Sequence, residues 1–155
     1  MTEGKVTVFS LQPEKFDLDL QNYKKPRLLY CMNGGYFLQI LQGGQVEGDR
    51  ERNNKYNELQ VQAVSVGVVY IKGTEAGQYL AMSTGGQLYG SRTLTDECLF
   101  VETIEENHYN TYKSQKYQDR NWYVGIKKNG HPKAGARTRI GQKAVYFLPL
   151  SVDDS

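Results

Sequence analysis

A repeat of about forty residues is the feature of this sequence that most constrains its fold. Residues 37–48 reappear as residues 79–90, with a glycine pair, the glutamine after it and a later glycine at matching places. A shorter third copy occupies residues 123–130, where an Asn-Gly pair replaces the glycine pair. Self-similarity at such a spacing is typical of chains built from several like units of supersecondary structure.

Each copy carries the signature of a β-hairpin. An alternating apolar stretch leads into Gly43-Gly44, Gly85-Gly86 or Asn129-Gly130, and a second short stretch follows. Two adjacent residues that tolerate positive φ predict a type I′ turn, because its twist matches that of the flanking strands.

Further strands are predicted after the turns, at Leu59–Val64, Leu99–Ile104 and Val145–Leu150. The 16 Gly and 12 Tyr also favour short strands and tight turns over helices. Propellers have at least about four blades, so three units favour a closed barrel. The predicted fold is all-β, a β-trefoil with three pseudo-repeats of about forty residues.

One domain is expected to hold most of the chain's 155 residues. We expect a flexible N-terminal arm at residues 1–24, the β-trefoil domain at residues 25–150 and a C-terminal tail at residues 151–155. No stretch approaches the roughly 18 apolar residues that span a bilayer, so membrane insertion is not expected. The first residues lack the apolar core of a secretory signal, which predicts synthesis in the cytosol and any export by a non-classical route.

The two cysteines, Cys31 and Cys98, are too few for the disulfide framework of a small secreted domain. Buried structural thiols are the favoured interpretation. A disulfide or a reactive cysteine is the alternative.

Positive charge is concentrated late in the chain. Between Lys113 and Lys143, nine basic residues and one acidic residue, Asp119, give a net charge of +8. Since the whole chain carries +2, the remainder carries −6. The basic residues are Lys113, Lys116, Arg120, Lys127, Lys128, Lys133, Arg137, Arg139 and Lys143. Such an asymmetry indicates a surface for a polyanion.

Two other interpretations of the basic segment remain at this point. A basic run is often only a solvated face. Nucleic-acid binding would call for aromatic side chains that stack on bases, but Trp122 and Tyr123 are predicted to fill the core, because Tyr123 falls on an apolar position of the repeat.

Six stretches of the chain form a more specific pattern: Asn22–Cys31, Asn33–Gly35, Gly77–Met82, Leu88–Ser91, Glu105–Tyr112 and Gly141–Ala144. In these stretches the chain resembles the fibroblast growth factor family, whose members are heparin-binding growth factors. The resemblance runs from about Glu14 to Leu150, and its family fold is the β-trefoil that the repeats indicate separately.

The resemblance implies a site for heparin or heparan sulfate. Its residues are Asn33, Lys127, Lys128, Asn129, Lys133, Arg137, Gln142 and Lys143. Sulfate groups need cationic partners, and amide side chains or exposed backbone N–H groups can orient them. Ala134 and Ala136 depart from the family pattern, which usually has a basic residue and a proline there, while Arg139 adds a charge.

The resemblance also implies contacts with the extracellular domains of fibroblast growth factor receptors. The residues are Tyr30, Arg50, Glu102, Asn107, Tyr109, Leu148 and Leu150. Amphipathic tyrosines and leucines with a few charges suit the core and rim of an interface. Pro149 predicts a break in strand pairing that leaves its neighbours accessible. Lys24, Lys25, Pro26 and Arg27 resemble a short nuclear-import sequence, and a solvated strand entry is the alternative.

The function implied is that of a secreted growth factor, present also in cytoplasm and nucleus. It would act as a monomer that dimerises on heparan sulfate as co-ligand and promotes receptor dimerisation and tyrosine kinase signalling for cell proliferation, migration, differentiation and angiogenesis. Catalysis, a metal and a cofactor are not expected, because His108 and His131 are the only histidines and no catalytic motif surrounds them. A trefoil carbohydrate-binding lectin and an intracellular homologous factor are the alternatives.

Overall fold

The computed structural model describes residues 25–152. Ten strands follow one another along this part of the chain. They are β1 (Arg27–Cys31), β2 (Phe37–Ile40), β3 (Val46–Asp49), β4 (Leu59–Ser65), β5 (Val68–Gly73), β6 (Gln78–Met82), β7 (Leu88–Ser91), β8 (Phe100–Ile104), β9 (Asn110–Ser114) and β10 (Phe147–Ser151). The helices within residues 25–152 are single 3₁₀ turns: η2 (Lys55–Asn57), η3 (Asp96–Cys98), η4 (Gln118–Arg120), η5 (Gly135–Arg137) and η6 (Lys143–Val145).

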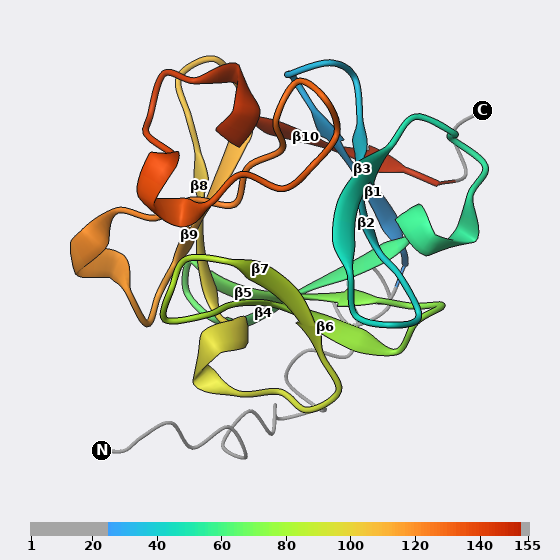
Figure 1. The fold of residues 1–155 in the computed structure, drawn as a ribbon, viewed down its shortest axis with the longest axis horizontal. Coiled ribbons are helices and arrows are strands. Elements are labelled where there is room, and N and C mark those ends of the chain that lie inside the picture. The colour runs from blue at the N-terminus through green and yellow to red at the C-terminus, as the bar shows by residue number, and fades with distance from the viewer. Residues whose placement is uncertain (1–24, 153–155) are drawn as a thin grey trace.

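Six strands close into a barrel. All pairings are antiparallel, in the order β1, β10, β9, β8, β5, β4 and back to β1. The β2–β3 pair continues from β1, and the β6–β7 pair continues from β5. Figure 1 shows β1–β3, β4–β7 and β8–β10 on three sides of a common centre. The all-β prediction is confirmed, and the closed barrel with extra strands is consistent with a β-trefoil.

The three predicted strands form with small shifts in their bounds. The first runs one residue further than predicted, to Ser65, and the second begins one residue later, at Phe100. The third begins at Phe147, because residues 143–145 form η6 before it.

The prediction of type I′ turns is wrong. Gly44, Gly86 and Gly130 have φ values of +90°, +81° and +91°, but the residue before each of them does not have positive φ. Gly44 and Gly130 each donate a 2.9 Å hydrogen bond to the carbonyl three residues earlier, at Leu41 and Lys127. This is a type I turn followed by a left-handed glycine, a three-residue connection that also fits the twist of the strands. Since only the second position needs positive φ, asparagine is accepted at the first.

Three hydrogen bonds link these turns to one another. The N–H of Gly90 donates to the carbonyl of Gly44 at 2.8 Å, and that of Gly135 donates to Gly86 at 2.8 Å. Gly48 in turn donates to the carbonyl of Gly130 at 2.7 Å. Each turn therefore holds a glycine from another part of the chain, and the three contacts together form a ring.

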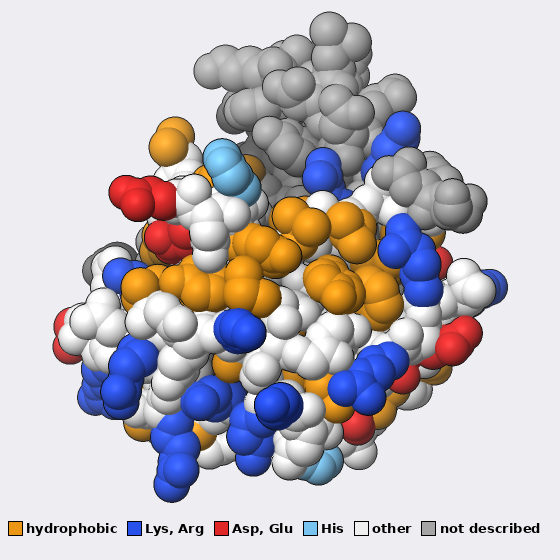
Figure 2. All heavy atoms as spheres, turned by 90° about the horizontal axis from the view of Figure 1, so that it is seen from above, with side chains coloured by type: hydrophobic (Ala, Val, Ile, Leu, Met, Phe, Trp, Pro, Cys, Tyr) orange, Lys and Arg blue, Asp and Glu red, His pale blue; other side chains and the backbone are white. Residues whose placement is uncertain are grey.

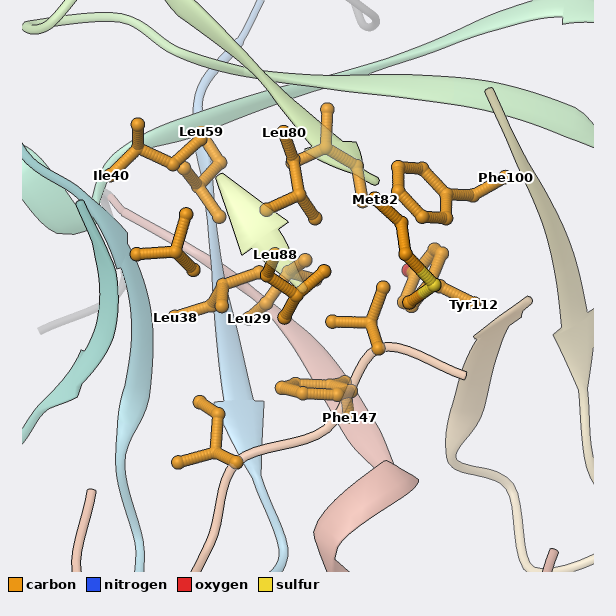
Figure 3. Packing of buried hydrophobic residues seen from close by; sticks show 14 of the residues in the cluster. Leu29, Leu38, Ile40, Leu59, Leu80, Met82, Leu88, Phe100, Tyr112 and Phe147 are labelled. Atoms are coloured by element: carbon orange, nitrogen blue, oxygen red, sulfur yellow. The ribbon is translucent and has the colours of Figure 1, made fainter. Parts of the chain in front are cut away.

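The core fills the barrel and the space beneath the hairpins. Figure 3 shows Leu29, Leu80, Phe100 and Phe147, among others, pointing toward one another from different strands, and each of these four is at most 1% exposed. Each such side chain contributes about 1.5–3 kcal/mol by leaving water. Trp122 is partly buried and packs against this cluster, whereas Tyr123, which was also predicted to fill the core, is half-buried and is not part of the cluster.

Both cysteines are buried and unpaired, as favoured above. Cys31 lies beneath the segment that precedes β10, with its Sγ 3.4 Å from the carbonyl oxygen of Ala144. Burial raises the pKa of the Cys31 thiol to about 11, so the reactive thiolate is scarce at neutral pH.

Candidate functional site

Three of the predicted glycan-site residues lie on one exposed turn. The N–H of Lys127 donates to the carbonyl of His131 at 2.8 Å, which closes the turn at residues 127–131. Asn129 Oδ1 accepts a hydrogen bond from the N–H of His131 at 3.0 Å. Lys127, Lys128 and Asn129 are all exposed. The backbone is thus fixed while both ammonium groups face solvent.

Asn33 joins this turn from a distant part of the sequence. Its Nδ2 donates a 3.0 Å hydrogen bond to the carbonyl of Ile126, 93 residues later in the chain. The loop between β1 and β2 is therefore held against the start of the turn at residues 127–131. This contact places the Asn33 side chain beside the turn that carries Lys127, Lys128 and Asn129.

The remaining predicted residues follow in the same segment, where Gln142 supports a loop. Gln142 Nε2 donates to the carbonyl of Arg137 at 3.1 Å, and its Oε1 accepts from the N–H of Arg139 at 3.1 Å. Gln142 thus fixes the backbone that presents Arg137. Arg137 and Lys143 are exposed, whereas Lys133 is half-buried. We define the glycan surface as the eight predicted residues, Asn33, Lys127, Lys128, Asn129, Lys133, Arg137, Gln142 and Lys143.

Tyr36 supports the glycan surface and was missed by sequence reasoning. Its hydroxyl donates to the carbonyl of Lys128 at 3.1 Å. The guanidinium of Arg50 lies 4.4 Å from the Tyr36 ring centroid, and Arg50 Nε donates to the carbonyl of Gly34 at 3.1 Å. Arg50, predicted as a receptor contact, therefore also packs against the support of the turn at residues 127–131.

The repeat held a signal for Tyr36. Tyr36, Gln78 and Trp122 each stand one position before a copy of the repeat. A Cβ built on Gly48 would lie 2.7 Å from the Tyr36 side chain, and one built on Gly135 would lie 2.9 Å from that of Trp122. A repeat unit that begins one residue earlier includes Tyr36, Gln78 and Trp122, and so points to their contacts with the glycines of the ring.

The predicted receptor contacts lie mainly on regular strands. Tyr30 of β1 stands opposite Leu148 of β10, and Leu150 stands opposite Leu28. Since side chains two apart share a face of a strand, Tyr30, Leu148 and Leu150 face the same way. All three are half-buried, so part of each is available to a partner.

Two further predicted contacts come from the turn between β8 and β9. Asn107 Oδ1 accepts a hydrogen bond from the N–H of Tyr109 at 3.0 Å, and the N–H of His108 donates to the backbone carbonyl of Glu105 at 2.9 Å. His108 has a φ of +71°, at the place where the three other turns have glycine. We define the strand surface as Tyr30, Asn107, Tyr109, Leu148 and Leu150.

Glu102 is bound into the protein beside a cavity. Its Oε2 accepts from the Tyr112 hydroxyl at 2.9 Å and from Asn110 Nδ2 at 3.4 Å. Burial, followed by the nearby Glu102 carboxylate, raises the pKa of Tyr112. The cavity has a volume of about 270 Å³ and is lined by Arg27, Val61, Ala63, Val69, Glu102, Asn110, Tyr112 and Pro149.

Pro149 stands in a strand that is paired fully on one side only. β10 pairs with β1 along its whole length but with β9 only between Phe147 and Asn110. Pro149 is paired with Leu29 and β10 lies between β1 and β9, so the proline does not mark an edge strand, although the pairing with β9 ends before it.

The residues that resemble a nuclear-import sequence begin at the limit of the described chain. Lys24 lies outside the described residues. Lys25 is exposed, Pro26 is half-buried and Arg27 starts β1 opposite Ser151.

Apolar and basic side chains are adjacent on one side of the molecule. Figure 2 shows a patch of hydrophobic side chains with Lys and Arg gathered along one border. This is the upper side of Figure 1, where β10 and the segment leading into it lie.

Within residues 25–152, no three His, Cys, Asp or Glu side chains are grouped to hold a metal ion. The same part of the chain contains no helix with the length and apolar character needed to cross a bilayer.

Known proteins resemble this chain over nearly its whole length. Residues 25–148 match the family model described as Fibroblast growth factor. Fibroblast growth factor 1 of Xenopus laevis is 61% identical over 150 residues, which cover 97% of each chain. Fibroblast growth factor 1 of Cynops pyrrhogaster is 56% identical over 147 residues, covering 95% of this chain and 99% of that one. The counterpart of Notophthalmus viridescens is 60% identical over 129 residues, covering 83% and 98%. The chain therefore belongs to the fibroblast growth factor family.

Proposed function

We propose that this protein is an extracellular growth factor that binds heparan sulfate and fibroblast growth factor receptors together. The observation that carries the proposal is the hydrogen bond from Asn33 to the Ile126 carbonyl, because it places an amide side chain from a distant segment beside the turn that carries Lys127 and Lys128. Together with family membership, this arrangement supports a sulfated glycan as the ligand. The three hairpin units are proposed to be the equivalent thirds of a β-trefoil.

The chemistry of the glycan surface suits a sulfated chain. Lys127, Lys128, Arg137 and Lys143 are exposed cations, and exposed Asn129 adds an amide. Each cation that contacts a sulfate releases counterions from the polyanion, so affinity should fall steeply as salt is added. A lectin for neutral sugars would lack this salt dependence.

The strand surface supports a protein partner. Half-buried Tyr30, Tyr109, Leu148 and Leu150 offer apolar area with polar tips, which is the usual make-up of an interface core. A protein held by both a glycan and a receptor gains effective concentration at the cell surface. Two modest contacts can thereby bring two receptors together and start tyrosine kinase signalling. Export by a non-classical route and additional roles in cytoplasm and nucleus complete the proposal.

Receptor phosphorylation in cells tests the proposal directly. Receptor-bearing cells that lack their own heparan sulfate receive the purified protein with and without heparin. We expect phosphorylation that depends on heparin, and a Lys127→Ala/Lys128→Ala variant with about 30-fold weaker heparin affinity near physiological salt. Phosphorylation that is absent under both conditions would refute the receptor half. An unchanged eluting salt concentration of the double variant on a heparin column would refute the site.

A further inference from the structure

The loop after β3 is built around the carboxylate of Asp49, the last residue of that strand. Asp49 Oδ2 accepts a hydrogen bond from the N–H of Glu51 at 3.3 Å. The same oxygen accepts from the side-chain amides of Asn54 at 3.2 Å and Asn57 at 3.1 Å. Hydrogen bonds to an ionised acceptor are stronger than those between neutral groups. This one oxygen therefore anchors the loop to the 3₁₀ turn η2 that follows it.

Asn57 holds the Asp49 carboxylate from inside the protein, where the Asn57 side chain is fully buried. Its Nδ2 also donates to the carbonyl of Glu51 at 2.8 Å, and its Oδ1 accepts from Nε2 of Gln39 at 3.1 Å. Gln39 belongs to β2 and is only 5% exposed. Buried amides lower stability unless they are hydrogen-bonded, and here their hydrogen bonds fix a loop that faces solvent.

Arg50 is the exposed side chain next to this anchor. Its backbone lies between Asp49 and Glu51, which the hydrogen bonds above hold in place. Its side chain is held by the loop between β1 and β2. There Nε donates to the carbonyl of Gly34 at 3.1 Å, and the guanidinium lies 4.4 Å from the Tyr36 ring centroid. Both contacts leave the two Nη groups, which can bind an acceptor of a partner through parallel hydrogen bonds.

We infer that Asp49, held by buried Asn57, is a positioning residue for Arg50 in receptor binding. The inference rests on the proposed function and on Arg50 as a predicted receptor contact. A long side chain and its loop lose conformational freedom when a partner orders them, and this loss weakens binding. Since the loop is already fixed by the Asp49 carboxylate, the receptor meets Arg50 in an ordered position. Without that carboxylate, the N–H of Glu51 and the amide of Asn54 lose their shared acceptor, and the receptor would have to order the loop itself.

A double-mutant cycle with Arg50 distinguishes positioning from simple stabilisation. Surface plasmon resonance measures binding of the full chain to the receptor ectodomain for Asp49→Ala, Arg50→Ala and the double variant. We expect about fivefold weaker binding for Asp49→Ala and at least about tenfold for Arg50→Ala. The double variant should bind no more weakly than Arg50→Ala alone, because Asp49 acts through Arg50.

Two further measurements accompany the cycle. Asp49→Asn should restore part of the receptor affinity, because the amide oxygen still accepts hydrogen bonds but lacks the charge. Heparin elution of Asp49→Ala should change little, because the Tyr36 hydroxyl still holds the Lys128 carbonyl.

Asp96→Ala is the matched control for the loss of one carboxylate. Asp96 of η3 also fixes a neighbouring side chain, with its Oδ1 3.2 Å from Lys116 Nζ. Urea unfolding of all variants should show that each is folded at the temperature of the binding experiment. The inference is overturned if Asp49→Ala binds the receptor as tightly as Asp96→Ala does. It is also overturned if Arg50→Ala leaves receptor binding unchanged, or if Asp49→Ala weakens binding by the same factor with and without Arg50. Failure of the unaltered protein to bind the receptor would instead overturn the proposed function.

Discussion

The glycan surface and the strand surface are built in opposite ways. The first is presented by turns and loops between residues 127 and 143, in which single hydrogen bonds fix the backbone and the charged groups face water. The second lies mainly on β1 and β10, which are paired at five positions and line the barrel. Loop charges can change without cost to the core, whereas the strand residues are tied to it. The difference implies that glycan affinity can be altered without loss of stability, whereas substitution of the receptor contacts on β1 and β10 should also change stability.

Arg50, a predicted receptor contact outside the strand surface, is connected to the glycan surface. Arg50 stacks on Tyr36, and the Tyr36 hydroxyl holds the carbonyl of Lys128. Substitution of Arg50 should therefore disturb both surfaces, and Arg50 is a poor choice for separating their effects.

Phe147→Ala should impair the glycan surface and the strand surface together, and it should have the largest effect on stability. Phe147 is fully buried, packs 6.2 Å from the Tyr112 ring and stands opposite Cys31. Its loss should lower the free energy of unfolding by about 3–5 kcal/mol. Urea unfolding measures this, and heparin and receptor binding should fall together near the unfolding temperature. Loss of only one activity would show that the surfaces do not share this core.

Tyr109→Ala should separate the surfaces. Tyr109 is half-buried beside the exposed turn between β8 and β9, and its loss should weaken receptor binding by more than about fivefold. Heparin elution should stay unchanged. Surface plasmon resonance with the receptor ectodomain, run beside a heparin column, checks both. Equal loss of both activities would indicate unfolding and would contradict the separation.

Tyr36→Phe should affect the glycan surface but not the strand surface, and its effect should be smaller than that of Tyr109→Ala. The substitution removes the hydrogen bond to the Lys128 carbonyl but keeps the ring beneath Arg50. We expect about 0.5–1.5 kcal/mol lower stability and heparin elution at slightly lower salt. Gln60→Ala on β4 serves as a comparison remote from that turn. A change in receptor affinity as large as the change in heparin elution would contradict the local role.

His108→Gly compares the turn between β8 and β9 with the turns that have glycine at the same place, and it should have the smallest effect. His108 has a φ of +71° in the turn between β8 and β9, next to the strand surface. Gly130 takes the equivalent left-handed position in the turn of the glycan surface. Relief of the left-handed conformation is worth about 1–2 kcal/mol, partly offset by the freedom of glycine in the unfolded chain. Thermal unfolding should show a net gain of about 0.5–1 kcal/mol. His108→Ala, which keeps the strain, should show no such gain.

Sequence patterns predicted the strands and the basic segment because periodicity and charge are local properties. They missed the turn type because a glycine pair does not specify which of its residues takes positive φ. They missed Tyr36 because its bond to Lys128 spans 92 residues, and Gln142 was assigned to glycan contact although its amide binds the backbone at Arg137. Whether a polar side chain contacts a ligand or supports the backbone depends on its neighbours, which only the fold brings together.

The pairing of β1 with β10 has a consequence for biosynthesis. The barrel closes only when Arg27 meets Ser151, which means that the last strand must have been synthesised first. At translation rates of about 5–20 residues per second, β1 waits roughly 6–25 s for its partner. During that interval its unpaired edge can associate with other newly made chains, so crowding of ribosomes on one message should favour misassembly.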